Sequence, residues 1–221
     1  MEKDGLHKEM YRLESEYNQT IGFWVSFFAE RAYNIDKKEN GSAVKINMFK
    51  KKDSDALSLV GIGNFVKAIA NAEHGADGEL ELKVFTTDWG ESSTNDWGIM
   101  QINETFFPSE SKTGWLLKGL HFTEVDWKNN PFVNIGAGIG ELFTYIRYSG
   151  HNFSEQLSFD DWLDSAGFYN TGLSPKAKDE MQERINSGKP KKGDSQKRID
   201  AWYSYRAKVR TGWGKFFNNN K

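Results

Sequence analysis

Residues 58–75 read S-L-V-G-I-G-N-F-V-K-A-I-A-N-A-E-H-G and contain the pattern on which the expected fold depends. Apolar side chains recur there every three or four positions, which is the spacing of one buried helix face. These positions are Ile62, Phe65, Val66, Ile69 and Ala70. Glu73 lies about 20° from Ile62 around the helix axis, so it continues the buried face. Gly75 is a typical helix stop.

A carboxyl group at the end of an apolar stripe can serve as an acid. It loses solvation, which raises its pKa and lets it keep a proton near neutral pH. A general acid acting on a glycosidic oxygen needs this property. A glutamate at a frayed helix end that reaches solvent or pairs with a lysine would show the same spacing. On spacing alone, both interpretations of Glu73 stay open.

The next informative stretch, residues 87–103, reads T-D-W-G-E-S-S-T-N-D-W-G-I-M-Q-I-N and contains Asp-Trp-Gly twice. Its Gly, Ser and Thr content predicts turns or a short hairpin. Asp96 or Asp88 could supply a second carboxylate opposite Glu73, although an aspartate before a turn usually satisfies backbone donors. The residues expected to be buried after the turn are Ile99, Met100 and Ile102.

Composition limits the class of protein. The chain has 221 residues, 38% hydrophobic and 27% charged, which is typical of a soluble globular protein of one domain with an appendage. A net charge of −2 argues against a general nucleic-acid binder. The absence of cysteine excludes disulfides, thiolate zinc sites and cysteine nucleophiles. We expect no metal and no cofactor.

The N-terminal part is expected to be a helical extension. Apolar residues recur at helical spacing over residues 6–33, which predicts one or two amphipathic helices. They are Met10, Leu13, Tyr17, Ile21, Trp24 and Phe28. The apolar run at residues 21–29 is shorter than the roughly 18 residues of a membrane span, and acidic residues before it argue against a signal peptide. A loop follows, so we divide the chain into an extension and linker (1–55) and a catalytic domain (56–221).

Three further motifs carry a family resemblance. Residues 95–103, N-D-W-G-I-M-Q-I-N, resemble a signature of chicken-type lysozymes and of the lytic transglycosylases that accompany secretion systems, pili and phage tails. Residues 130–142, N-P-F-V-N-I-G-A-G-I-G-E-L, look like the family's next helix, and F-Y-N-T-G at 168–172 is similar to the transglycosylase Tyr-Asn-x-Gly motif. The family's catalytic glutamate ends a helix upstream, as Glu73 does. The resemblance covers about residues 59–172.

The resemblance implies a mostly helical α+β fold, a lysozyme-like domain with an N-terminal helical extension. It also implies that Glu73 is catalytic and that Asp96 stands where the signature has its aspartate. His74 departs from the serine found in many transglycosylases; it could tune Glu73, bind substrate or be a surface histidine. The candidate substrate-binding residues are Gln101, Tyr169, Asn170, Trp97 and His74.

The implied activity is cleavage of the β-1,4 MurNAc-GlcNAc bond of peptidoglycan. In the transglycosylases that the chain resembles, one Glu protonates the leaving oxygen and then helps the 6-hydroxyl to close a 1,6-anhydro ring. The Tyr-Asn-x-Gly match favours this chemistry. The alternatives are a hydrolytic lysozyme using Glu73 and Asp96, and a non-catalytic glycan-binding or structural component of a secretion or phage assembly.

The resemblance also sets expectations for partners and place. Peptidoglycan strands are the expected partner, and a secretion, pilus or phage-tail assembly is a further one. We expect no binding of nucleic acid and no membrane span. The expected site of action is periplasmic or extracytoplasmic, although no export signal is visible. A basic tail at 189–215 could approach an anionic wall or be a solvated helix face. Four tryptophans could stack on sugar rings or pack in a core: Trp89, Trp97, Trp115 and Trp127.

Overall fold

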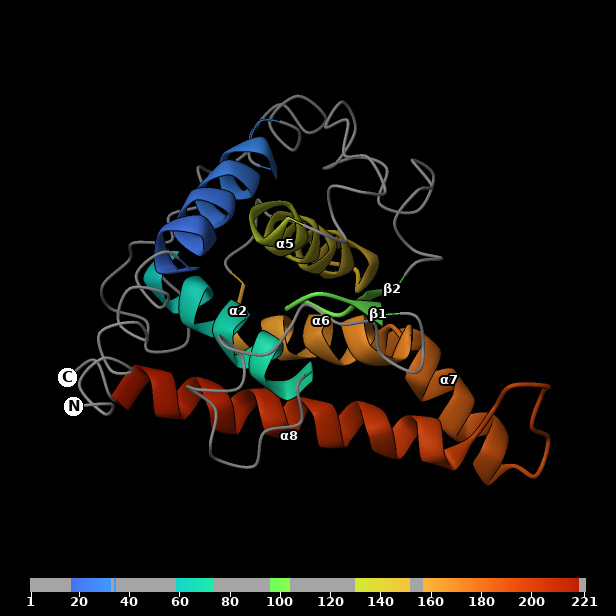
Figure 1. Ribbon diagram of the computed structural model, residues 1–221. Helices are drawn as coiled ribbons and strands as arrows, with labels where there is room; N and C mark the ends of the chain where they lie inside the picture. Colours follow the sequence, from blue (N-terminus) through green and yellow to red (C-terminus); the bar gives the residue numbers. More distant parts are fainter. Residues whose placement is uncertain are drawn as a thin grey trace, which may run out of the picture.

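The computed structural model describes residues 17–32, 34, 59–73, 96–103, 130–151 and 157–218 (Figure 1). An N-terminal helix covers residues 17–32. The elements that follow are α2 (Leu59–Glu73), β1 (Asp96–Trp97), β2 (Ile102–Asn103), α5 (Pro131–Tyr148), α6 (Phe159–Thr171), α7 (Pro175–Asn186) and α8 (Gln196–Asn218). The described part of the chain is therefore mostly helical, as the sequence predicts, and its strands form one short hairpin.

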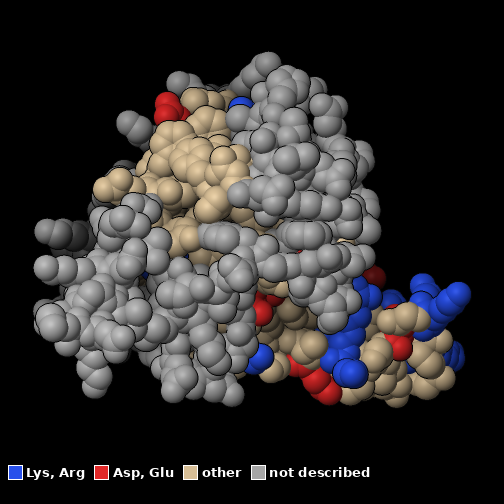
Figure 2. All heavy atoms as spheres, viewed as in Figure 1, with Lys and Arg blue, Asp and Glu red and all other residues tan. Residues whose placement is uncertain are grey.

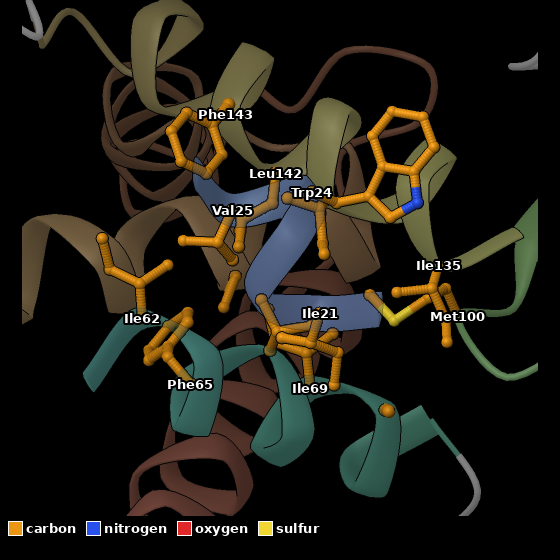
Figure 3. Packing of buried hydrophobic residues seen from close by; sticks show 14 of the residues in the cluster. Ile21, Trp24, Val25, Ile62, Phe65, Ile69, Met100, Ile135, Leu142 and Phe143 are labelled. Atoms are coloured by element: carbon orange, nitrogen blue, oxygen red, sulfur yellow. The ribbon is translucent and has the colours of Figure 1, made fainter. Parts of the chain in front are cut away.

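The N-terminal helix, α2, α5 and α6 share one hydrophobic core with the hairpin and part of α8. Figure 3 shows Trp24 and Val25 of the N-terminal helix facing α5, with Phe65 and Ile69 of α2 below them. Every residue of the predicted α2 stripe is buried. The N-terminal helix is thus part of this core, while the predicted boundary near residue 55 lies outside the described residues.

Local sequence signals explain where α5 and α6 begin and end. Asn130 caps α5, its side chain accepting a hydrogen bond from the Phe132 amide, and Pro131 occupies the first turn. Ser158 and Asp161 form a capping box at the start of α6. Gly172 ends α6 with a left-handed φ of 64°, a conformation that glycine adopts without steric cost. The Tyr-Asn-x-Gly motif therefore marks the end of a helix.

Helix α8 runs along α2 and α6, and α7 folds back against its N-terminal part (Figure 1). A small apolar cluster joins α7 to α8, and it consists of Leu173, Met181, Ile199 and Trp202. Two basic residues of the predicted tail bind carboxylates of α6: Arg206 lies 2.8 Å from Asp164, and Arg210 lies 2.6 Å from Asp160. These two residues fasten α8 to α6.

Lysine and arginine side chains gather at the far end of the α7 and α8 pair, where Figure 2 shows blue atoms at the lower right. The turn between the helices is held by Arg184, whose guanidinium donates two hydrogen bonds to Asp194 at 2.7 and 2.8 Å. This pairing holds the pKa of Asp194 well below its ordinary value. Among the described helices, none is long and apolar enough to cross a membrane.

Candidate active site

Glu73 is the last residue of α2 and lies against α8. The Tyr205 hydroxyl donates a hydrogen bond to Glu73 Oε1 at 2.5 Å. Burial raises the pKa of Glu73 to about 7; the Tyr205 hydrogen bond and the Lys208 charge lower the pKa, and the nearby Asp96 charge raises it. A carboxyl group with this pKa is partly protonated at neutral pH and can donate or accept a proton there.

The hairpin carries a second carboxylate, whose charge acts on Glu73. Strands β1 and β2 are antiparallel, with Asp96 opposite Asn103. The Asn103 side-chain amide donates to Asp96 Oδ1 at 2.7 Å, which fixes the orientation of that carboxylate. The charge of Asp96 raises the pKa of Glu73, after the larger effects of burial and of the Tyr205 hydrogen bond.

The turn between the strands is held from two sides through the backbone of Met100. Its N–H donates to Asn134 Oδ1 of α5 at 3.0 Å, and its carbonyl accepts a hydrogen bond from the Tyr169 hydroxyl of α6 at 2.6 Å. Met100 also packs so closely on Gly138 that a Cβ atom there would lie 2.6 Å from the Met100 Cβ. We call this arrangement the Met100 clamp. It fixes the turn that carries Asp96 and Gln101.

Gln101 is strained at the centre of this turn. It is the one described non-glycine residue with a positive φ, at 45°. Its side-chain amide donates to the Gly98 carbonyl at 2.7 Å, and its backbone N–H donates to the same oxygen at 3.1 Å. The half-buried Gln101 side chain is therefore tied to the turn itself, next to the strand that carries Asp96.

The structure adds two residues to which the sequence analysis gave no role. Tyr205 follows Glu73 by 132 positions, and no motif connects the two. Glu141 lies within the residues 130–142 and is 6% exposed. Burial raises the pKa of Glu141 to about 7; a hydrogen bond from Tyr145 lowers it, and the charges of Glu73 and Asp96 raise it further. One sequence feature could have indicated Glu141: it is a single carboxylate within an otherwise apolar helix.

The other candidate residues from the sequence analysis fall into three groups: near the site, exposed, or outside the described residues. Tyr169 lies in the site region, where burial and the charges of Glu141, Glu73 and Asp96 raise its pKa. Asn170, the next residue, is exposed. Trp97 forms part of β1, but its side chain lies outside the described residues, as do His74, Asp88, Trp89, Trp115 and Trp127 in full. Among the described side chains, no three acidic or histidine groups converge as a metal site.

Comparison with protein-family models, with curated proteins and with solved structures finds no match to this chain. The family resemblance thus rests on the short motifs. The site combines a titratable glutamate that Tyr205 orients, a second carboxylate on a clamped turn, and a third carboxyl group that is buried in α5.

Proposed function

We propose that the protein cleaves the β-1,4 glycosidic bond between MurNAc and GlcNAc in peptidoglycan, on a lysozyme-like domain, with Glu73 as the general acid. The observation that carries this proposal is the state of Glu73. Its carboxyl group is oriented by Tyr205, and burial raises its pKa to about 7. A glycosidase acid must hold a proton at the pH of the reaction and lose it in the transition state.

The order of elements supports the same proposal. Glu73 ends a helix, a short hairpin carrying Asp96 follows, and α5 packs behind the hairpin through the Met100 clamp. The motifs that resemble the lysozyme-like family occur in this order along the chain. The substrate of such an enzyme lies outside the cytoplasmic membrane, so we propose that the protein acts in the periplasm or at the wall.

Within this activity we favour lytic transglycosylation. Glu73 would protonate the leaving oxygen, and its carboxylate would then take the proton of the sugar 6-hydroxyl as that oxygen closes the 1,6-anhydro ring. The support is the Tyr-Asn-x-Gly motif, whose Tyr169 binds the turn beside Asp96. A hydrolytic lysozyme is the second candidate, because the charge of Asp96 acts on Glu73 and could stabilise a cationic sugar.

The test is digestion of purified cell walls, followed by turbidity and by mass spectrometry of the released muropeptides. We expect clearing and products with 1,6-anhydro ends, each lighter by one water than a hydrolysis product. Glu73→Gln should abolish clearing, since the amide keeps the shape but cannot donate the proton. Glu183→Gln, the same change at an exposed position of α7, is the matched control.

Each other outcome has a defined meaning. Products with reducing ends alone would replace the transglycosylase by the hydrolytic lysozyme. A folded Glu73→Gln protein that still clears walls would remove Glu73 as the acid. No clearing by the wild-type protein would favour a non-catalytic, glycan-binding or structural role, which a pull-down with intact walls would then measure.

A further inference from the structure

The turn that joins α7 to α8 presents positive charge that the described part of the chain does not use. It lies at the end of the helix pair that extends beyond the other described helices (Figure 1). Four lysines are exposed there, three in the turn and one in the first turn of α8: Lys189, Lys191, Lys192 and Lys197. Within the described residues, none of the four side chains forms an ion pair. We call these four residues the lysine tip.

Hydrogen bonds hold the backbone that carries the lysine tip. Asp194 accepts two hydrogen bonds from the Arg184 guanidinium and one from the Lys191 backbone N–H, the latter at 2.9 Å. The Asp194 N–H donates back to the Lys191 carbonyl at 3.0 Å. On the α7 side, the Lys189 N–H donates to the Arg184 carbonyl at 2.9 Å. The turn is therefore ordered before any partner arrives, and binding costs little backbone entropy.

Little negative charge offsets the lysine tip. Asp194 is the acid of the turn, and its side chain is 5% exposed and bound by Arg184. The next exposed acids along the chain, Glu183 and Asp200, lie inside α7 and α8. The whole chain carries a net charge of −2, so the tip concentrates positive charge on a protein that is otherwise acidic. This asymmetry would orient the protein with its tip towards an anionic surface.

The kind of exposed cation indicates the kind of partner. The arginines of this region are occupied: Arg184 binds Asp194, and Arg198 donates two hydrogen bonds to the Thr171 carbonyl, at 3.1 and 2.7 Å. An arginine fork recognises a phosphate in one geometry, whereas a lysine acts as a point charge. Residues 187–197 contain no aromatic ring on which a nucleic-acid base could stack. The tip thus fits a surface over which anionic headgroups are spread.

We propose that the lysine tip docks the protein on a membrane surface that contains anionic phospholipids. This interaction goes beyond the proposed function and does not depend on it. Each lysine near such a surface strengthens binding by about fivefold, and clusters of about four to eight basic residues are typical of segments that bind anionic lipids. Pro190 is the one apolar ring in residues 187–197, so the contact is a reversible electrostatic adsorption without insertion.

The test is co-sedimentation of the full chain with lipid vesicles. Vesicles of phosphatidylcholine with about 30% phosphatidylglycerol are compared with vesicles of phosphatidylcholine alone, at NaCl concentrations from about 50 to 500 mM. We expect binding to the anionic vesicles at low salt, loss of this binding at high salt, and no binding to the neutral vesicles. These comparisons use the wild-type protein alone, so they do not depend on how a variant folds.

Variants of the lysine tip give the second readout. A protein in which all four lysines are changed to glutamine should bind anionic vesicles more than about a hundredfold more weakly, because four contributions are lost. Lys191→Gln alone should weaken binding by about fivefold. Lys176→Gln is the matched control and should bind as the wild-type protein does. Lys176 is also exposed on this helix pair, but it lies in the first turn of α7, at the other end from the tip.

Several outcomes would overturn the proposal. Absence of vesicle binding, equal binding to both kinds of vesicle, or binding that salt does not weaken would each exclude electrostatic docking on anionic lipid. Tighter binding to a random-sequence DNA duplex, or to soluble poly(glycerol phosphate), at equal phosphate concentration would assign the tip to that polymer instead. Wall clearing by the same preparations tests the proposed function separately, since the tip variants leave Glu73 and Tyr205 in place.

Discussion

At the scale of single residues, the hydroxyl of Tyr205 is the group that fixes Glu73. It donates a hydrogen bond to the carboxyl group and so favours the ionised form. Tyr205→Phe removes this bond. We expect the pKa of Glu73 to rise, so that activity persists to higher pH, and turnover to fall by about tenfold to a hundredfold because the carboxyl group loses its orientation.

The measurement is a pH profile of wall clearing for this variant and for Tyr203→Phe. Tyr203 is exposed on the same helix, and its hydroxyl accepts a hydrogen bond from Lys178, so the control makes the same chemical change away from Glu73. A Tyr205→Phe protein with the wild-type profile would show that the hydroxyl does not act on the acid.

Asp96 separates the two mechanisms. The amide of Asp96→Asn can still accept the hydrogen bond from Asn103, so the hairpin should persist. If Glu73 acts alone, the variant keeps substantial activity; if Asp96 stabilises a cationic sugar, the rate falls by several orders of magnitude. We expect the first result. Removal of the Asp96 charge also lowers the pKa of Glu73, so rates are compared at the pH optimum of each protein. Asp200→Asn, at an exposed position of α8, is the control.

At the scale of elements, the Met100 clamp depends on close approach of the turn to α5. A Cβ atom at position 138 would lie 2.6 Å from the Cβ and 2.7 Å from the Cγ of Met100, and these atoms cannot move without moving the turn. Gly138→Ala should lower the free energy of unfolding by about 1–3 kcal/mol. Turnover should fall as well, because Asp96 and Gln101 move with the turn.

Urea unfolding and wall clearing are measured on this variant and on Gly22→Ala. Gly22 lies in the N-terminal helix, and no described atom lies within 4 Å of the position that a Cβ would take. That control should be neutral or more stable by about 0.5–1 kcal/mol, because alanine favours a helix. Wild-type stability in Gly138→Ala would contradict the close packing.

The elements that could be predicted from sequence are those with a local signal. The stripe of α2 follows from the spacing of apolar residues, and the turn at residues 96–103 follows from turn composition. The helix at residues 130–142 is expected from the family resemblance alone. Tyr205 and Glu141 could not be assigned in this way. The contact of Tyr205 with Glu73 depends on how α8 packs along α2. The burial of Glu141 depends on the elements that enclose α5 on every side between Asn134 and Ile146. Local periodicity specifies neither. The pairing of Arg206 with Asp164 could not be predicted either, because it also depends on how α8 packs against another helix.

At the scale of the whole molecule, the buried carboxyl groups determine how stability depends on pH. The pKa values of Glu73 and Glu141 rise from 4.5 to about 7 on folding, so the folded protein binds these protons more tightly than the unfolded chain. This contribution is present below pH 4.5 and is lost as the pH rises towards 7, on the order of 3 kcal/mol per group. Asp194 acts oppositely, since its lowered pKa removes stability in strong acid.

We therefore expect maximal stability near pH 4 to 5, and a decline towards neutral pH. Urea unfolding at intervals from pH 3 to 8 measures this. In Glu141→Gln the decline should be smaller, whereas Glu183→Gln should follow the wild-type curve. A wild-type stability that rises between pH 4.5 and 7 would contradict the assignment of raised pKa values to the two buried glutamates.

The hydrogen bond between Tyr205 and Glu73 also has a consequence for when the Glu73 carboxyl group becomes oriented during folding. It joins positions 132 residues apart, and contacts of such large sequence separation form slowly because a long loop must close first. On a ribosome, α2, the hairpin, α5 and α6 all emerge before α8. A nascent or truncated chain without α8 lacks the Tyr205 hydroxyl, so its Glu73 carboxyl group has lost this hydrogen bond. Docking of α8 is thus the folding step that orients the Glu73 carboxyl group.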